Sequence, residues 1–144
     1  MSKGLYPFGL NHYRSLKFQK LRKLISKNQK KIKVEGAYGS SLSFLLIDIF
    51  SSINQQIFYI SNSKETASYV YSDIVELIGE INCSFLPSNY RSDAKKIKDE
   101  SNIINRSKTI RDILDNETKI IVTYPEAIFE KIPNEKEIDS KTIN

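Results

Sequence analysis

The stretch 31–53, KIKVEGAYGSSLSFLLIDIFSSI, constrains the fold of this chain more than any other. Ile32 and Val34 alternate with charged residues, which is the period-two pattern of a β-strand. Gly36 and Gly39 then predict a tight turn, because glycine adopts backbone conformations that other residues avoid. The nearly continuous apolar run that follows predicts a buried helix. A strand, a glycine loop and a helix, in this order, form the setting in which phosphate-binding loops occur.

The candidate phosphate loop comprises Gly36, Ala37, Tyr38, Gly39, Ser40, Ser41, Leu42 and Ser43. Phosphate-binding loops follow the pattern G-x-x-x-x-G-K-[ST], in which the lysine contacts the β- and γ-phosphates. If Gly36 is the first glycine, Leu42 occupies the lysine position and Ser43 matches the last residue. If Gly39 is the second glycine, Ser40 occupies the lysine position. Since no register supplies a lysine, the segment is either a degenerate nucleotide-binding loop or a purely structural turn.

The rest of the chain alternates between short apolar runs and segments of helical periodicity. The further expected strands span 56–61, 81–86 and 119–123. The first of them holds a continuous apolar run, as in a strand covered on both faces. The expected helices beside the one that follows the glycine loop span 13–26, 62–78, 103–114 and 125–131. The second of these is expected to start at Asn62 or Ser63 and to be ended by Gly79, and Pro125 is expected at the first position of the last. This alternation predicts an α/β fold with a parallel sheet of about four strands and helices on both faces.

Three of these helices have a predicted apolar face. On the helix 62–78, it holds Ala67, Val70, Tyr71, Ile74, Leu77 and Ile78. On the first helix, the apolar face holds Phe18, Leu21, Leu24 and Ile25. On the helix 103–114, the residues expected to point inward are Ile104, Ile110, Ile113 and Leu114. The first helix also carries a lysine-rich face, which is either a solvated surface or a docking surface for nucleic acid or an acidic partner.

Ligands of parallel sheets bind beyond the carboxyl ends of the strands. The loops expected at that edge are 36–41, 61–63, 87–91 and 123–125. Next to this edge, a polar segment holds the candidate nucleic-acid or partner contacts Tyr90, Arg91, Lys95, Lys96 and Lys98. Basic residues beside an aromatic ring suit a nucleic-acid backbone and base. The alternative is a solvent-exposed loop of mixed charge.

The composition excludes several classes of protein. No apolar run reaches the length of a membrane span and no secretory signal is evident, so we expect no membrane association and a cytoplasmic location. Cys83 is the one cysteine, which excludes an internal disulfide, and its place in an expected strand predicts a small buried thiol. The net charge of +5 favours polyanionic partners only mildly.

No catalytic set emerges from the sequence. The fourth expected strand ends in TYPEA, without an acidic pair that would hold magnesium. A G-x-S-x-G nucleophile elbow is absent, and the chain has a single histidine, His12, with no cluster of metal-ligating residues around it. We therefore expect no catalytic residues, no metal site and no cofactor.

Three segments carry a resemblance, namely VEGAYGSSLSFLL, FLPSNYRSDAKKIKDESNIINRSKTI and IIVTYPEAIFEKI. In this order, they resemble the N-terminal domain of the bacterial transcription-repair coupling factor, a large ATP-dependent DNA translocase. The last two are similar to the family patterns F-P-S-x-Y and I-V-T-Y-P-E-A-L-x-E-K, and Arg106 stands at the family's recurrent arginine. The resemblance covers the range 31–131.

This resemblance implies a helicase-like domain similar to the first domain of excinuclease B, the excision-repair helicase, with a partial RecA-like (P-loop) fold that has lost its nucleotide-binding lysine. The expected divisions are an irregular lead-in and basic helix at 1–30, the degenerate helicase-like α/β domain at 31–133 and a polar tail at 134–144. The tail stops where family members would continue, so we expect a fragment.

By resemblance, the role is non-catalytic and architectural, in nucleotide excision repair on transcribed DNA. The implied partners of the full-length protein are excinuclease A, DNA and RNA polymerase. The family's N-terminal module recruits excinuclease A and restrains the motor when it is idle. Two other functions remain open at this point: a nucleotide-binding enzyme with an unusual loop, and a small nucleic-acid-binding module that uses the lysine-rich helix and the segment 91–98.

Overall fold

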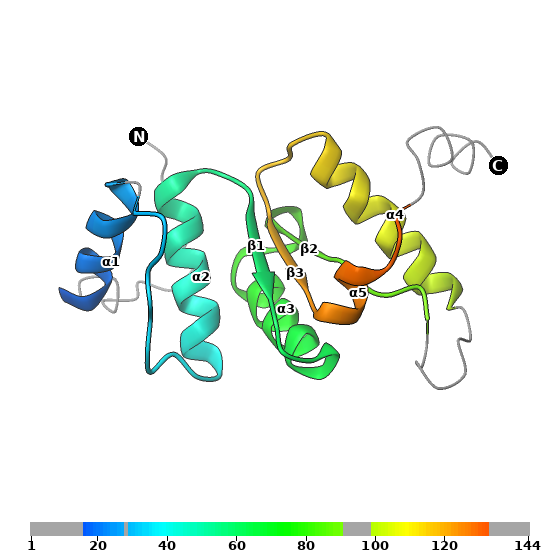
Figure 1. Ribbon diagram of the computed structural model, residues 1–144, viewed down its shortest axis with the longest axis horizontal. Coiled ribbons are helices and arrows are strands. Elements are labelled where there is room, and N and C mark those ends of the chain that lie inside the picture. Colours follow the sequence, from blue (N-terminus) through cyan, green and yellow to red (C-terminus); the bar gives the residue numbers. More distant parts are fainter. Residues whose placement is uncertain (1–15, 28, 91–98, 133–144) are drawn as a thin grey trace.

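A computed structural model of the chain describes residues 16–27, 29–90 and 99–132. In these ranges, the strands β1 (Ile57–Ile60), β2 (Cys83–Phe85) and β3 (Ile120–Thr123) form one sheet. The helices are α1 (Leu16–Ser26), α2 (Ser40–Ile53), α3 (Lys64–Ile78), α4 (Glu100–Leu114) and α5 (Pro125–Phe129), with a 3₁₀ turn at Glu80–Asn82. Helices α1 and α2 lie on one side of the strands and α4 on the other (Figure 1). The prediction of an α/β fold is thus confirmed.

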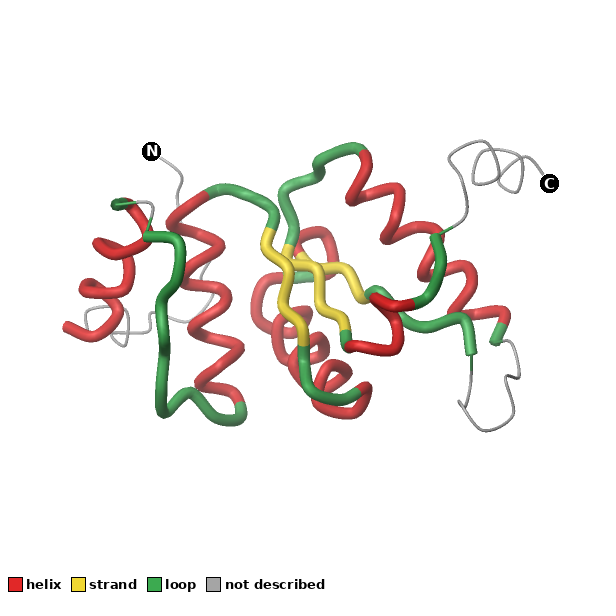
Figure 2. Tube along the Cα trace, in the orientation of Figure 1, coloured by secondary structure: helices red, strands yellow, loops and turns green. Residues whose placement is uncertain are grey.

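The sheet is parallel, with strand order β1-β3-β2, so β3 lies between the other two. Helix α3 connects β1 to β2, and α4 connects β2 back to β3. The two connections cross the sheet in opposite directions and on opposite faces, so they have the same hand. Figure 2 shows the three strands enclosed between helices.

The core follows from the alternation of side chains along β3. Ile120 and Val122 point into the larger cluster, which contains residues of α2 and α3 such as Ile47 and Ile74. Ile121, between them in sequence, points to the opposite face and packs with residues of α4. Both faces of β3 are therefore covered, and all four of its residues are buried.

Local signals in the sequence located several helix ends. The Ser63 side chain accepts a hydrogen bond from the Thr66 backbone N–H, which satisfies a donor at the start of α3. Gly79, at φ +83°, ends the same helix in a backbone conformation that favours glycine. Pro125 occupies the start of α5, where its missing N–H removes no helical hydrogen bond. Helix α5 ends at Phe129, two residues before the predicted end.

The predicted strand at 31–35 is wrong. This segment has no strand structure, and the sheet has three strands rather than about four. β3 is already hydrogen-bonded on both sides, and this segment does not pair with the outer edge of β1 either. The chain instead runs between α1 and α2 (Figure 1). Val34, one of the two apolar residues of the strand-like pattern, is 47% exposed. Alternation of apolar and charged residues therefore did not suffice to place a strand here.

The prediction that the first apolar strand is covered on both faces is also wrong. Ile57 and Tyr59 of β1 pack against the core, whereas Phe58 and Ile60 are 49% and 57% exposed. Their backbone groups point to the outer edge of the sheet, since Ile57 N–H and Ser61 N–H donate to β3. Within the described ranges, no segment pairs with that edge. The strand is thus an edge strand with one open face.

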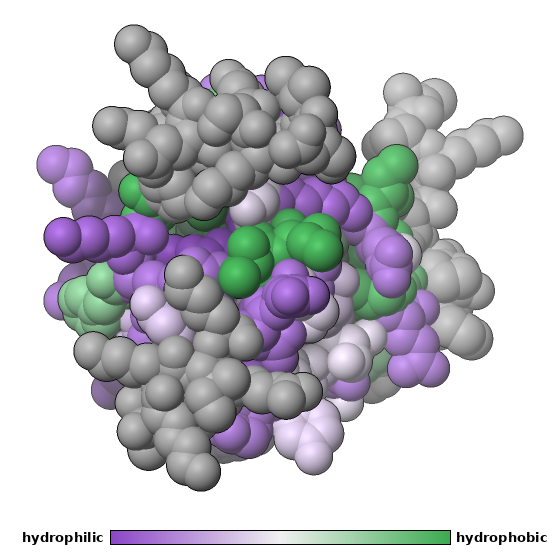
Figure 3. Space-filling model, turned by 90° about the vertical axis from the view of Figure 1, so that its right-hand side faces the viewer, coloured by the Kyte–Doolittle hydropathy of each residue, from purple (hydrophilic) through white to green (hydrophobic). Residues whose placement is uncertain are grey.

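Helix α4 presents a different face to the sheet from the one predicted. Ile110 is buried and Ile113 packs beside it, as expected, but Ile104 is 67% exposed and Leu114 is 48% exposed. The inward face is completed by polar residues, because Arg106, Thr109 and Asp112 are buried. Apolar side chains consequently reach the surface among hydrophilic ones on this side of the molecule (Figure 3).

The third expected strand is shorter than predicted, because residues Glu80–Asn82 form a 3₁₀ turn before β2 begins. None of the helices in the described ranges combines the length and the apolar character needed to cross a membrane. The predicted lead-in and tail lie mostly outside the described residues.

We predict that Ile74→Ala lowers the free energy of unfolding by about 2–4 kcal/mol, because it leaves a cavity where the side chain is fully buried. Ile104→Ala is the matched control, since that side chain is largely exposed, and it should leave stability unchanged. Urea unfolding followed by circular dichroism measures both. Equal effects of the two substitutions would contradict the orientation of α4 described above.

Candidate functional site

The glycine loop 36–41 closes on itself through Ser41. The Ser41 hydroxyl accepts a hydrogen bond from Tyr38 N–H at 2.8 Å and donates to Tyr38 O at 2.6 Å. Gly36 and Gly39 have φ values of +83° and +54°, so both turns need the conformational freedom of glycine. Tyr38 itself is 82% exposed. The loop is therefore a self-contained turn at the start of α2.

In the register that begins at Gly36, the residues at the two diagnostic positions of the loop face the protein interior. Leu42, at the lysine position, packs against the larger core cluster. Ser43, at the position of the magnesium-binding hydroxyl, is fully buried and donates a hydrogen bond to Asp73 Oδ2 of α3 at 3.1 Å. Ser40, at the lysine position in the other register, is exposed. The remaining predicted loop residue, Ala37, is half-buried. The loop itself thus brings no cation to the place where a phosphate would sit.

The other loops predicted at the carboxyl ends of the strands do lie there, after β1, β2 and β3. The start of α2 lies at the same end of the molecule as the start of α3 (Figure 1). The glycine loop thus reaches the expected end of the fold, although the strand expected before it is missing.

A buried arginine joins the loop that follows β2 to the helix α5 that follows β3. The Arg106 side chain is 2% exposed, and its guanidinium donates to Pro87 O at 2.8 Å, Ala127 O at 2.8 Å and Glu130 O at 3.0 Å. Burial lowers the pKa of Arg106, while the charge of Glu130 and the Tyr124 hydroxyl oppose that shift. Because guanidinium remains protonated in proteins, the three carbonyls receive charge-assisted hydrogen bonds.

Neighbouring side chains reinforce this junction. Tyr124 accepts a hydrogen bond from Ser88 N–H at 2.9 Å through its hydroxyl, and burial raises the pKa of that hydroxyl. The Glu130 carboxylate accepts from Asn89 N–H at 2.9 Å. Thr123 donates to Leu86 O at 3.1 Å, and Thr109 donates to Phe85 O at 2.8 Å. The residues of the FLPSNY and TYPEAIFEK segments are thus engaged with one another.

Of the predicted nucleic-acid or partner contacts, only Tyr90 belongs to the described residues. It is half-buried, and its N–H donates to Ser88 Oγ at 3.2 Å. Arg91, Lys95, Lys96 and Lys98 lie outside the described residues. On either side of these residues, the chain is held together by a hydrogen bond, which Asp99 N–H donates to Asn89 O at 2.9 Å.

Sequence reasoning missed an ion pair between α1 and α2. Asp48 interrupts the apolar run of α2, is fully buried and receives the guanidinium of Arg22 through both carboxylate oxygens. A carboxylate on an otherwise apolar helix face signals such a partner, because an unpaired buried charge is strongly unfavourable. The pair fixes α1 on the outer side of α2.

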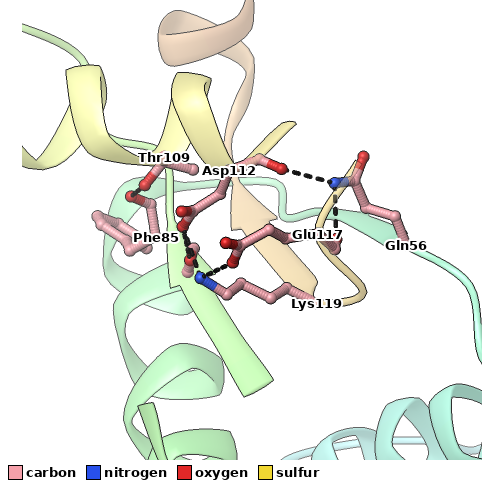
Figure 4. A network of polar contacts seen from close by, with 7 residues as sticks. Gln56, Phe85, Thr109, Asp112, Glu117 and Lys119 are labelled. Atoms are coloured by element: carbon pink, nitrogen blue, oxygen red, sulfur yellow. Dashed lines mark hydrogen bonds and ion pairs between the residues drawn. The ribbon is translucent and has the colours of Figure 1, made fainter. Parts of the chain in front are cut away.

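A second polar network lies at the amino end of β3 (Figure 4). Lys119 Nζ lies 3.0 Å from Asp112 Oδ2 and 2.6 Å from Glu117 Oε2. Ser84 Oγ donates to Asp112 at 2.7 Å, and Gln56 donates to Glu117 O at 3.0 Å. Burial alone would lower the pKa of Lys119, but the hydrogen bonds to Glu117 and Asp112 raise it. This network connects α4 to β2 and to the residues just before β1 and β3, far from the glycine loop.

Cys83 is 2% exposed, which confirms the prediction of a buried thiol, and burial raises its pKa to about 12. In the ranges that the structure describes, there is no group of three or more His, Cys, Asp or Glu residues that could hold a metal ion. No family model matches this chain, and no curated protein matches it either.

We predict that Arg106→Met lowers the free energy of unfolding by about 3–5 kcal/mol, because three buried carbonyls lose their donor. Lys108→Met on the exposed side of the same helix is the control and should have little effect. Urea unfolding gives both values. A loss below about 1 kcal/mol for Arg106→Met would show that the junction does not depend on this side chain.

We also predict that Cys83 reacts with a thiol reagent at pH 8 about 100-fold more slowly in the folded than in the urea-unfolded protein, because its thiol is buried and protonated. The raised pKa of Cys83 also determines whether stability rises or falls with pH. The unfolded thiol ionises near pH 9.0 and the folded one near 12, so stability falls as pH rises across that window. Cys83→Ala removes this part of the pH dependence. Fast labelling of the folded protein would contradict the prediction.

Proposed function

We propose that this chain is the non-catalytic, helicase-like N-terminal domain of a bacterial transcription-repair coupling factor. The observation that carries the proposal is the contact of Arg106 with both Pro87 and Ala127. Pro87 belongs to the segment FLPSNY and Ala127 to TYPEAIFEK, and these segments and this arginine are what the resemblance rests on. Their residues bond to one another at the carboxyl end of the sheet. Such mutual engagement suits an architectural role rather than a reaction.

The glycine loop supports the same proposal. A competent phosphate loop places a lysine on the β- and γ-phosphates and a hydroxyl on magnesium. Here Leu42 packs against the core and Ser43 bonds to Asp73. A three-stranded parallel sheet with helices on both faces further supports a partial RecA-like domain in which nucleotide binding has been lost.

We predict that magnesium and ATP leave the midpoint of thermal unfolding unchanged. Ligand at a hundred times its dissociation constant would add about 2.7 kcal/mol, so binding would be readily detected. The variant Leu42→Lys should also show no shift and should lose about 1–3 kcal/mol of stability, because the charge enters a packed site. A clear shift with the unaltered chain would contradict the proposal.

The function itself is tested by a chimaera. This chain replaces the corresponding N-terminal segment of a coupling factor, and the idle ATPase rate and binding of excinuclease A are measured. The proposal expects the chimaera to keep a low idle ATPase rate, close to that of the parent. A chimaera as active as a protein lacking the segment would overturn it. Titration of excinuclease A with the isolated chain then shows whether this domain itself binds excinuclease A.

A further inference from the structure

One side of the molecule carries positive charge with little compensation. Every ionisable side chain between Leu16 and Val34 is basic. The described lysines of this stretch are all exposed, namely Lys20, Lys23, Lys27, Lys30, Lys31 and Lys33. Arg22 differs from them, because Asp48 holds it. Within the described ranges, Glu35 is the single acidic side chain in an ion pair with one of these lysines.

The same segments border an open groove of about 470 Å³. It lies between α1, the segment 32–37 and the first turns of α2, where the chain passes between the two helices (Figure 1). Its apolar lining consists of Phe18, Leu21, Leu24, Ile32, Val34, Ala37 and Leu45. Lys20, Lys33 and Glu35 stand among these residues. The volume falls within the range of sites that bury a ligand, roughly 300–1,000 Å³.

From the apolar lining and the surrounding lysines, we propose that this groove binds an acidic amphipathic helical segment of a partner protein. Apolar side chains of the segment occupy the groove beside Leu24 and Val34, and its carboxylates face Lys20 and Lys33. Helices bind grooves in this way through apolar residues at i, i+3, i+4 and i+7. Complementary charge at the rim directs the encounter and selects against basic partners.

The lining favours a peptide over a nucleic acid. Nucleic-acid grooves provide aromatic rings on which bases stack, together with hydrogen-bonding groups for base edges. The groove is lined chiefly by aliphatic side chains, with Phe18 as its aromatic residue. A nucleic acid would therefore use the lysines and leave the apolar floor unoccupied.

The test uses a fluorescein-labelled peptide of about 15 residues, with leucine at helical i, i+3, i+4 and i+7 spacing and glutamate at most other positions. Fluorescence anisotropy measures its binding to the full chain at low salt. Lys20→Glu combined with Lys33→Glu should weaken binding of the peptide about 10-fold. Val34→Asp should weaken it as much, although it leaves both lysines in place. Lys108→Glu, an exposed lysine on α4, is the matched control and should change binding less than about 2-fold.

A charge exchange completes the test. A peptide with lysine in place of glutamate should bind the doubly reversed variant better than it binds the unaltered chain. Because the substituted residues are exposed, circular dichroism should show that the variants fold. Equal binding of a scrambled peptide, insensitivity to Val34→Asp, or complete absence of binding would overturn the proposal. Competition by duplex DNA that depends on the lysines but not on Val34 would also overturn it, and would assign the surface to nucleic acid.

Discussion

The fold depends on the full enclosure of β3. A parallel strand in the middle of a sheet needs hydrogen-bonded neighbours on both edges and helices on both faces. The neighbours are β1 and β2, and the residues of β3 alternate between the two core clusters. Every other described element except α1 either pairs with β3, covers it or connects parts that do. The sheet can be small because one fully buried strand organises it.

Polar contacts fix both ends of this strand. At its amino end, Lys119 joins Asp112 and Glu117, and at its carboxyl end Arg106 joins the loop that follows β2 to α5. Both clusters draw on α4, which therefore attaches to the sheet chiefly through polar groups. Apolar packing supplies most of the driving force for folding, but directional bonds of this kind specify one position of a helix among several similar ones.

Local signals in the sequence predicted local structure well. Ser63, Gly79 and Pro125 marked helix ends because their effects act within a few residues. Contacts between segments that lie far apart in the sequence were harder to predict. The segment 31–35 has a strand-like pattern, yet it pairs with no strand and runs between α1 and α2. Ile104 was expected inside because it fits the apolar periodicity of its helix. That pattern cannot reveal that the polar residues Arg106 and Thr109 are buried on the inward face instead. The glycine loop was recognised as lacking its lysine, but the bond from Ser43 to Asp73 links two helices that the sequence does not place together.

Among the described residues, the outer edge of β1 has no paired strand, which has a consequence for the behaviour of the protein in solution. Proteins usually protect such edges with lysine, proline or a bulge, because an unpaired strand with apolar side chains recruits other strands. β1 reads Ile-Phe-Tyr-Ile and has none of these features. The net charge of +5 opposes such association through mutual repulsion between molecules. Since salt screens that repulsion, the colloidal stability of the described fold is tied to ionic strength.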